Sequence, residues 1–370
     1  MVLFNSRLFK KYLIPGFVFQ SVVIAGGYGT GRELVEYFLN YGPLGGVLGM
    51  FLFTTLIWSV LLAVTFEFSR VFKTYDYRSL FLKLLGRFWF TFEILYFILL
   101  IIVLAVVGSA AGVLLRDNFG IPYLAGVIII YAAIGFLAFK GSWLIERFLS
   151  TVSILLYIVF GVFLIMSVAK FGPQIQQKFA EAIIRPGWKI GGFKYALYNI
   201  AVIPAVLFCI KNLETRKEAL TTGFLSAVIG ILPGALILCA LVAHYPAVLP
   251  EEIPVMLALS KINLPFFMYV YQIVLFGALI TTGIGFIHSV NERFQSAFQA
   301  KGKEFPPWAR PVVAIGLLLA GSALSTFGLI QLVARGYGTA SYGVFLVFAL
   351  PMVTLGLYKI MRERGSQSVK

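Results

Sequence analysis

The sequence predicts an all-α membrane protein with ten transmembrane helices in a five-plus-five inverted repeat, in which helices 1 and 6 are interrupted. Of its 370 residues, 60% are hydrophobic and 12% are charged, a composition outside the usual range of soluble domains. Apolar runs near the length of roughly 20 residues that crosses a bilayer recur from end to end. Two of these runs, one opening each half of the chain, contain residues that break helices.

The spans follow from hydropathy, and their ends are marked by turn signals such as Tyr41-Gly42-Pro43 and Gly120-Ile121-Pro122. Because each half holds an odd number of spans, the second half enters the membrane from the opposite side. We therefore expect one transmembrane domain over 1–370, with repeats at 1–170 and 193–361. Short surface helices are predicted at Pro173–Ile184 and Glu251–Lys261. The ten predicted spans are Tyr12–Asn40, Leu44–Arg70, Phe88–Leu115, Tyr123–Phe139, Phe148–Ala169, Phe193–Ile210, Ala219–Ala243, Leu264–Val290, Pro311–Val333 and Ser341–Met361.

The distribution of positive charge predicts the orientation. The net charge is +15, and most of the 30 Lys and Arg residues fall in the connections that share a side with both termini. Cytoplasmic loops carry such an excess, so the chain is expected in the cell (inner) membrane, multi-pass, with cytoplasmic N- and C-termini. The same distribution excludes nucleic acid as a partner, because the basic residues report orientation rather than a binding face. The lipid bilayer is the expected surrounding, and the oligomeric state stays open.

The first span is interrupted by the sequence GGYGTG at Gly26–Gly31. A glycine-rich break frees backbone N–H and C=O groups, which hydrocarbon does not tolerate unless protein, ion or solute binds them. The alternative is close packing of helices through small residues. We take the break as the first binding-site candidate, with these substrate-binding residues: Gly26, Gly27, Gly29, Thr30 and Gly31.

The sixth span carries a matching interruption that ends at Pro204, a residue that removes a backbone donor and strains the preceding turn. A packed kink is the alternative reading of a lone proline. Tyr198 and Asn199 directly precede this break and are candidate substrate contacts, although tyrosines are also common at membrane interfaces. Interrupted helices at corresponding positions of two halves are the sequence pointer to a transporter site.

Three ionisable residues, Arg32, Glu33 and Glu36, follow the first break at membrane depth, where charges are costly and usually functional. Glu36 lies four residues after Arg32 and can pair with it on one helical face, whereas Glu33 points elsewhere. The functional interpretation makes Arg32 and Glu36 an outer gate and Glu33 a site wall or proton carrier. In the alternative, all three lie near the water boundary and satisfy one another.

The segment GGYGTGRELVEYF, Gly26–Phe38, resembles the first-span motif of the YkvI-like membrane proteins, a group similar to the sodium-coupled transporters of the LeuT fold. That resemblance implies a LeuT-like fold in the amino acid-polyamine-organocation superfamily. It also implies a sodium site formed by the carbonyls of Ala25 and Tyr28 and the hydroxyls of Thr281 and Thr282. Hard oxygen ligands suit sodium. Against this, a membrane threonine commonly bonds its own backbone one turn back.

These observations predict a secondary active transporter, a sodium-coupled symporter of an amino acid or a related small amine or carboxylate solute that works by alternating access. A helix N-terminus after the break suits a carboxylate. The alternatives are a proton-coupled transporter that uses Glu33, and a non-transporting membrane sensor on the same fold. The absence of Lys, Arg, Asp and Glu from Phe148–Ala169 favours sodium. The sequence has no HExxH or GxSxG motif, so we expect neither an enzyme nor a cofactor beyond the coupling ion.

Overall fold

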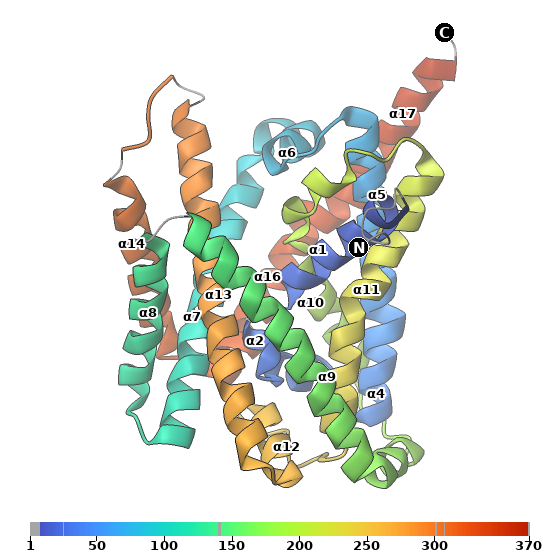
Figure 1. Ribbon diagram of the computed structural model, residues 1–370. Coiled ribbons are helices and arrows are strands. Elements are labelled where there is room, and N and C mark those ends of the chain that lie inside the picture. The colour runs from blue at the N-terminus through green and yellow to red at the C-terminus, as the bar shows by residue number, and fades with distance from the viewer. Residues whose placement is uncertain (1–7, 25, 140–141, 300–301, 307, 369–370) are drawn as a thin grey trace.

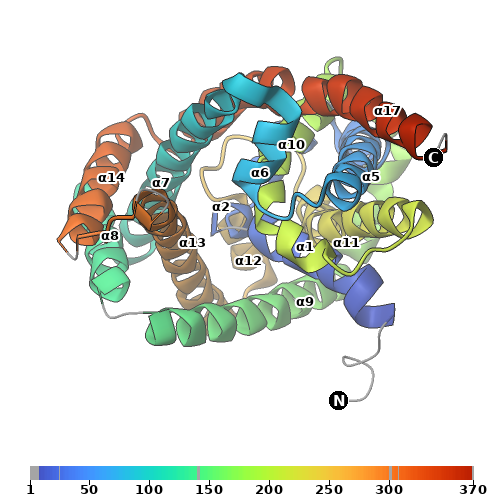
Figure 2. The same cartoon turned by 90° about the horizontal axis from the view of Figure 1, so that it is seen from above.

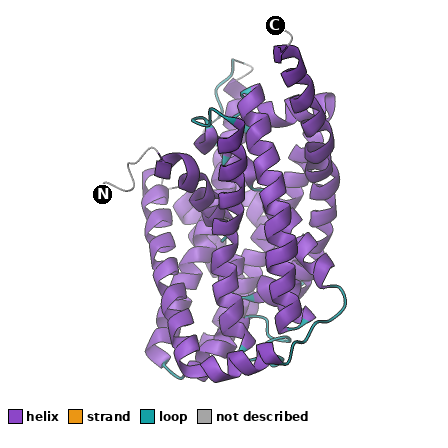
Figure 3. Cartoon of the chain, turned by 90° about the vertical axis from the view of Figure 1, so that its right-hand side faces the viewer, coloured by secondary structure: helices purple, strands orange, loops and turns teal. Residues whose placement is uncertain are grey.

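The computed structural model describes residues 8–24, 26–139, 142–299, 302–306 and 308–368, and this part of the chain is helical with no strand (Figure 3). Within it, six helices are long and apolar enough to cross a bilayer. Two shorter apolar helices, Tyr123–Leu137 and Ala309–Ser325, accompany them. Large apolar side chains face outward, among them Phe266 and Ile273, which are 82% and 72% exposed. The chain is a multi-pass membrane protein.

The α-helices agree in order with the predicted spans, and short 3₁₀ or π turns extend several of them. A 3₁₀ pair, Ile203–Ala205 and Leu207–Ile210, follows α10, and π turns join the pieces of the second and last spans. The helices are α1 (Ile14–Val23), α2 (Gly26–Gly29), α3 (Arg32–Tyr37), α4 (Pro43–Leu48), α5 (Thr55–Phe72), α6 (Tyr77–Leu85), α7 (Phe90–Phe119), α8 (Tyr123–Phe139), α9 (Ser142–Ala180), α10 (Trp188–Ile200), α11 (Arg216–Val242), α12 (Pro254–Ile262), α13 (Pro265–Gln299), α14 (Ala309–Ser325), α15 (Leu329–Gln331), α16 (Gly338–Val344) and α17 (Leu357–Ser368).

The long helices stand side by side, and α9 crosses one face of the bundle diagonally (Figure 1). Seen from above, α1, α2 and α10 lie inside a ring to which α5, α7, α8, α9 and α11 contribute, and α6 and α12 overlap the interior of this ring (Figure 2). The short helices α6 and α12 lie at opposite ends of the molecule (Figure 1). We call these ends the α6 side and the α12 side. The interrupted segments are therefore enclosed by protein, where free backbone groups are tolerated in a membrane.

Helices α1, α5, α10 and α11 pack against one another on one side of the interrupted segments. The indole Nε1 of Trp58 donates a hydrogen bond to the carbonyl of Ala196 at 2.9 Å, which ties α5 to α10. The ring of Phe19 in α1 meets the Trp58 ring edge-on at a centroid distance of 5.0 Å. Gly230 of α11 allows this approach, because a Cβ there would lie 2.8 Å from the Phe19 ring. Thr215 and Glu218 form a capping box that starts α11.

The boundary between the last two spans differs from the prediction. We expected a turn between Val333 and Ser341, but the chain turns at Gly328, where φ is +80°, and the last helix begins at Leu329. Gly336 lies inside that helix and packs on Ile102, whose Cγ2 would be 2.8 Å from an added Cβ. The prediction thus placed a turn near Gly336, a glycine that instead allows two helices to pack closely. Local sequence does not distinguish a glycine in a turn from a glycine at a helix contact.

Both predicted surface helices are present, with shifted ends. Residues Pro254–Ile262 form α12, which confirms the helix expected at 251–261. The stretch labelled α9 consists of two helices that meet at a kink at Phe171, whose φ and ψ are −121° and 15°, and the second of them runs to Ala180. This confirms the helix expected at 173–184, although its last residue lies four positions earlier than predicted. Pro173 lies in the first turn of this second helix, where a proline needs no N–H partner.

Candidate functional site

The first span is interrupted in the predicted place. Helix α1 ends at Val23, and Ile24 leaves helical geometry with ψ of 74°. One turn, α2, follows, and then Gly31 adopts a left-handed conformation at φ +78° before α3 begins. A side chain is strained at that φ, so glycine is required there. Ala25, one of the expected sodium ligands, lies outside the described residues.

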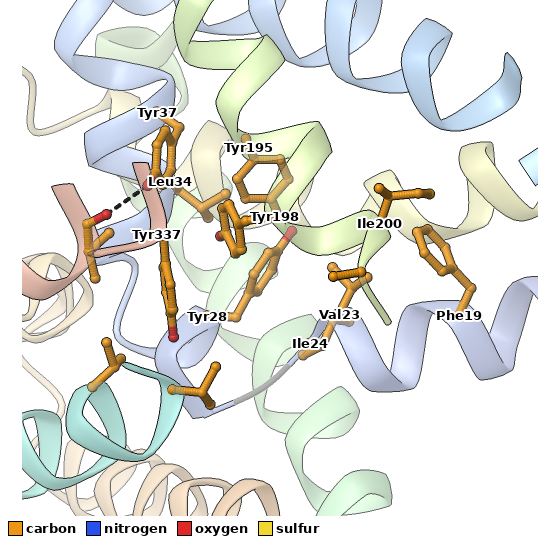
Figure 4. Packing of buried hydrophobic residues seen from close by; sticks show 14 of the residues in the cluster. Phe19, Val23, Ile24, Tyr28, Leu34, Tyr37, Tyr195, Tyr198, Ile200 and Tyr337 are labelled. Carbon is orange, nitrogen blue, oxygen red and sulfur yellow. Dashed lines mark hydrogen bonds between the residues drawn. The ribbon is translucent and has the colours of Figure 1, made fainter. Parts of the chain in front are cut away.

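The second interruption is also present. Helix α10 ends at Ile200, and the chain continues through a turn and two short 3₁₀ segments, with Pro204 in the first of them. This 3₁₀ segment contacts α1. Figure 4 shows Val23 and Ile24 at the end of α1 near Tyr198 and Ile200 of α10. The two breaks, which are far apart in the sequence, meet in the middle of the bundle.

A small cavity of about 40 Å³ lies where the breaks meet. It brings together three predicted site residues, namely Glu33 from α3 and Tyr198 and Asn199 from α10. The remaining walls come from α1, α7, α13 and the last span. The other lining residues are Val22, Val23, Tyr96, Leu99, Val103, Val202, Phe286 and Tyr337.

Two lining residues of this cavity, Tyr198 and Tyr337, belong to a cluster of buried tyrosines that Figure 4 shows. The rings of Tyr198 and Tyr337 are stacked, with centroids 4.6 Å apart and an interplanar angle of 12°. Tyr37 packs beside Tyr198 at 5.5 Å, and its hydroxyl donates to the carbonyl of Val333 at 2.6 Å. Tyr28 and Tyr195 are fully buried in the same cluster. Sequence reasoning missed Tyr337, because the predicted turn between Val333 and Ser341 contained it, whereas the structure places it inside the last span.

Glu33 is 4% exposed, and its carboxylate accepts a hydrogen bond from the hydroxyl of Tyr198. The carboxylate folds back toward the break, since a Cβ added to Gly27 would lie 2.7 Å from Glu33 Oε1. The ion pairs formed among the described residues do not include Glu33. The site therefore contains a buried acidic group without a cationic side chain beside it.

Arg32 points the other way, toward the α12 side. Its Nη2 lies 3.0 Å from Oε2 of Glu36, so the predicted ion pair is present. Its Nη1 donates to the carbonyls of Leu249 and Glu251, at 2.8 and 2.9 Å, in the segment that leads into α12. The side chain of Arg32 is 2% exposed. Arg32 thus connects α3 to the connection that covers the break.

The other residues of the first break face neighbouring helices. The carbonyl of Gly29 accepts from the hydroxyl of Tyr271 at 2.8 Å, and the carbonyl of Thr30 accepts from the backbone N–H of Val255 at 3.2 Å. A Cβ on Gly31 would lie 2.9 Å from Val255. The N–H of Arg32, at the start of α3, is bonded to the Thr30 hydroxyl at 3.1 Å. In this conformation α12 covers that helix start, where we expected a solute carboxylate.

Thr281 and Thr282 line a second, larger cavity of about 370 Å³. Their hydroxyls donate to the carbonyl of Ala278 at 2.8 and 2.9 Å, which is the self-bonding alternative noted above. A threonine hydroxyl that donates one bond can in addition accept one, so this self-bonding does not by itself exclude the Thr281 oxygen as a ligand. Tyr28 is not among the lining residues, and its carbonyl accepts from Gly31 N at 3.0 Å. The cavity is lined by Ser21, Val22, Ile24, Tyr96, Val152, Leu156, Ala205, Ala278, Thr281, Thr282, Gly285, Phe286 and Ser289.

The larger cavity lies toward the α6 side, since Phe286 and Ser289 belong to the half of α13 that is remote from α12. It shares Val22, Tyr96 and Phe286 with the small cavity. The rings of Tyr96 and Phe286 are 6.5 Å apart. The break is thus covered on the α12 side and bordered by a cavity on the α6 side.

Comparison with known proteins identifies one relative in sequence and several solved structures with a similar fold. No family model matches the chain. The chain is 25% identical over 310 residues to the uncharacterized membrane protein YkvI of Bacillus subtilis (strain 168), a match that covers 78% of this chain and 82% of that protein. The resemblance to YkvI-like membrane proteins, predicted from the first-span motif, is confirmed.

Two solved structures resemble the whole bundle. A Na+-coupled sialic acid symporter, in a substrate-bound outward-open state, has a TM-score of 0.61 and 16% sequence identity, covering 95% of this chain and 82% of its own. A mutant of the manganese transporter of Eremococcus coleocola has a TM-score of 0.56 and 13% identity, covering 93% and 78%. The chain therefore has the fold of LeuT-fold-like transporters.

Proposed function

We propose that this protein is a secondary active transporter that moves a small amine-bearing solute, an amino acid or a related compound, together with sodium. The observation that carries the proposal is the meeting of two interrupted helices at a cavity lined by Glu33, Tyr198 and Asn199. Backbone breaks at membrane depth are tolerated where they line a binding cavity. The fold shared with transporters supports the same function.

The proposed mechanism is alternating access within a five-plus-five inverted repeat. In this proposal, the six long apolar helices, the two shorter ones and the two interrupted segments are the ten spans of the repeat. Positive-inside charge makes the α6 side cytoplasmic in the cell membrane. The conformation then faces inward, because α12 covers the break on one side and the cavity of about 370 Å³ lies on the other.

Sodium is the proposed coupling ion. The hydroxyls of Thr281 and Thr282 line the same cavity as Val22, in the last turn of α1. The last carbonyls of a helix have no intrahelical partner, so that turn offers hard oxygen ligands opposite the hydroxyls. We therefore include the carbonyl of Val22 in the proposed ion site with the two threonines. A manganese cargo is less well supported, because the described residues contain no group of three or more His, Cys, Asp or Glu suited to a metal.

Uptake into proteoliposomes tests the function. Purified protein is reconstituted, a sodium or a proton gradient is imposed, and accumulation from a pooled metabolite mixture is read by mass spectrometry. We expect one solute class to accumulate with the sodium gradient and to stop when an ionophore dissipates that gradient. Accumulation driven by protons alone would favour the alternative in which buried Glu33 carries the proton. No gradient-dependent uptake of any solute would favour a sensor.

Thr282→Ala is expected to raise the sodium concentration for half-maximal uptake by roughly tenfold, since it removes one of a few neutral oxygen ligands. The measurement is uptake against sodium concentration at fixed solute. Thr354→Ala is the matched control, because the Thr354 hydroxyl also bonds a carbonyl one turn back, that of Leu350, but its side chain is exposed on the last span. Equal sodium dependence in both variants would remove α13 from the proposed ion site.

A further inference from the structure

The buried carboxylate of Glu33 has no positively charged partner among the described residues. It is almost fully buried, and its bonding partner is the neutral hydroxyl of Tyr198. Arg32 is adjacent in sequence but its guanidinium is engaged by Glu36 and by two carbonyls on the α12 side. Burial of a carboxylate costs several kcal/mol unless a cation or a proton compensates it. During the transport cycle the site must therefore receive one of the two.

The position of this carboxylate also determines which solute charge the break accepts. In transporters of this kind, half-helix N-termini at the break attract the anionic group of the solute. Here the Glu33 carboxylate already lies against the break, beside Gly27. A second carboxylate bound there would meet a like charge in a region of low dielectric, which is strongly unfavourable. No Lys or Arg is among the residues that line the small cavity to offset that repulsion.

The walls of the small cavity complete a cation-binding environment. Tyr198 and Tyr337 present stacked rings next to Glu33, and the negative faces of aromatic rings attract ammonium groups. The volume of about 40 Å³ fits a head group rather than a whole metabolite. The neighbouring cavity of about 370 Å³, which shares Val22, Tyr96 and Phe286, can hold a larger apolar body.

We propose that Glu33 is the acceptor for an ammonium group of the cargo, so that the transported solute is a small organic amine whose recognition needs no carboxylate. This inference rests on the proposed transport function and narrows it. The amine head lies between Glu33 and the Tyr198–Tyr337 pair, and the rest of the solute extends toward Thr281 and Phe286. The buried carboxylate and the cargo then neutralise each other, which explains why no Lys or Arg among the described residues forms an ion pair with Glu33.

Matched ligands separate this proposal from amino-acid recognition. The probes are phenylalanine, phenethylamine and phenylpropanoate, and the smaller set alanine, ethylamine and propanoate, each added to purified protein in sodium buffer. Binding is read as an increase in thermal midpoint and by competition with the solute found in the uptake assay. We expect the amine of at least one set to bind at least as tightly as the amino acid, and the acid not to bind. Tighter binding of the amino acid than of either amine would overturn the proposal.

Glu33→Gln tests the acceptor directly, because the amide oxygen can still accept from Tyr198 while the charge is lost. We expect amine affinity to fall by about 100-fold, the size typical of removing one partner of a buried charge pair. Glu93→Gln is the control, since Glu93 also accepts from a tyrosine, Tyr77 at 3.2 Å, but faces Arg293 at 3.6 Å. Tyr337→Leu provides a second variant that removes the ring face and keeps the charge; a several-fold loss is expected.

The outcomes also distinguish this inference from the transport function. Sodium-driven uptake of a solute without an ammonium group would overturn the inference and leave transport intact. Amine binding lost in Glu33→Gln, with no uptake in liposomes, would support the inference and remove transport. Unchanged amine affinity in Glu33→Gln with loss of dependence on a proton gradient would make Glu33 a proton carrier and overturn the proposal. Absence of binding by any amine would overturn it as well.

Discussion

Arg32→Gln is expected to open the α12 side of the break and to abolish net transport. The guanidinium of Arg32 bonds Glu36 and the carbonyls of Leu249 and Glu251, so one buried group connects α3 to the segment before α12. Loss of a buried, hydrogen-bonded charge costs about 3 kcal/mol. A change of this size shifts a two-state equilibrium by more than roughly 100-fold. We expect the closed α12 side to become a minor state.

Labelling of a cysteine introduced at Val255, which is buried against Gly31, measures this change. The native cysteines, Cys209 and Cys239, are first replaced by serine, and a membrane-impermeant maleimide is added to intact cells. Arg116→Gln is the matched control, because Arg116 also bonds the segment before α12, through Glu252 at 2.7 Å, but its side chain is 46% exposed. Exposed pairs contribute little. Equal labelling rates in both variants would contradict a gating role for Arg32.

Gly234→Ala is expected to eliminate transport and to destabilise the protein by about 3 kcal/mol, at the upper end of the usual cost of overpacking a core. A Cβ at Gly234 in α11 would collide with the hydroxyl of Tyr28 and lie 2.9 Å from its Cζ. Tyr28 is fully buried among the site tyrosines, so its ring has no free space to move into. The displaced ring would move α2 and with it the first break.

Thermal inactivation in detergent, followed by size-exclusion chromatography, measures the stability of the variant. Gly316→Ala is the matched control, because Gly316 lies in a helix and an added Cβ there has no neighbour within 4 Å. The thermal stability of Gly316→Ala is expected to be unchanged or slightly higher than that of the unmodified protein. Tyr28→Phe in the Gly234→Ala background removes the colliding hydroxyl and should recover part of the loss. A Gly234→Ala protein as stable and active as Gly316→Ala would show that Tyr28 does not hold the break in place.

The helix order and both interruptions were accessible from sequence, since hydropathy, glycine clusters and proline act on the backbone locally. The Arg32–Glu36 ion pair was accessible for the same reason, because residues four apart share a helical face. Span boundaries were less accessible. Gly328 in the turn and Gly336 in the helix look alike in the sequence. The structure distinguishes them, because Gly336 packs on Ile102 and Gly328 adopts a positive φ.

The contents of the candidate site could be predicted only in part. Glu33, Tyr198 and Asn199 were selected because they flank the breaks, and the structure brings them to one cavity. Tyr96 and Phe286 were missed, since each belongs to a continuous helix and no local pattern marks it, and Tyr337 was missed because the predicted turn contained it. Tyr28 was predicted beside Thr281 and Thr282, but Val22 rather than Tyr28 lines the cavity of these threonines.

The sequence by itself determined that this is a membrane protein whose backbone is interrupted at two central places, because bilayer length and helix breaking are properties of short segments. Tertiary structure alone decided which groups face the breaks. It placed the Arg32 guanidinium against the segment before α12 and the Glu33 carboxylate beside Tyr198. Such directions depend on the packing of segments far apart in the chain, and no local periodicity encodes them.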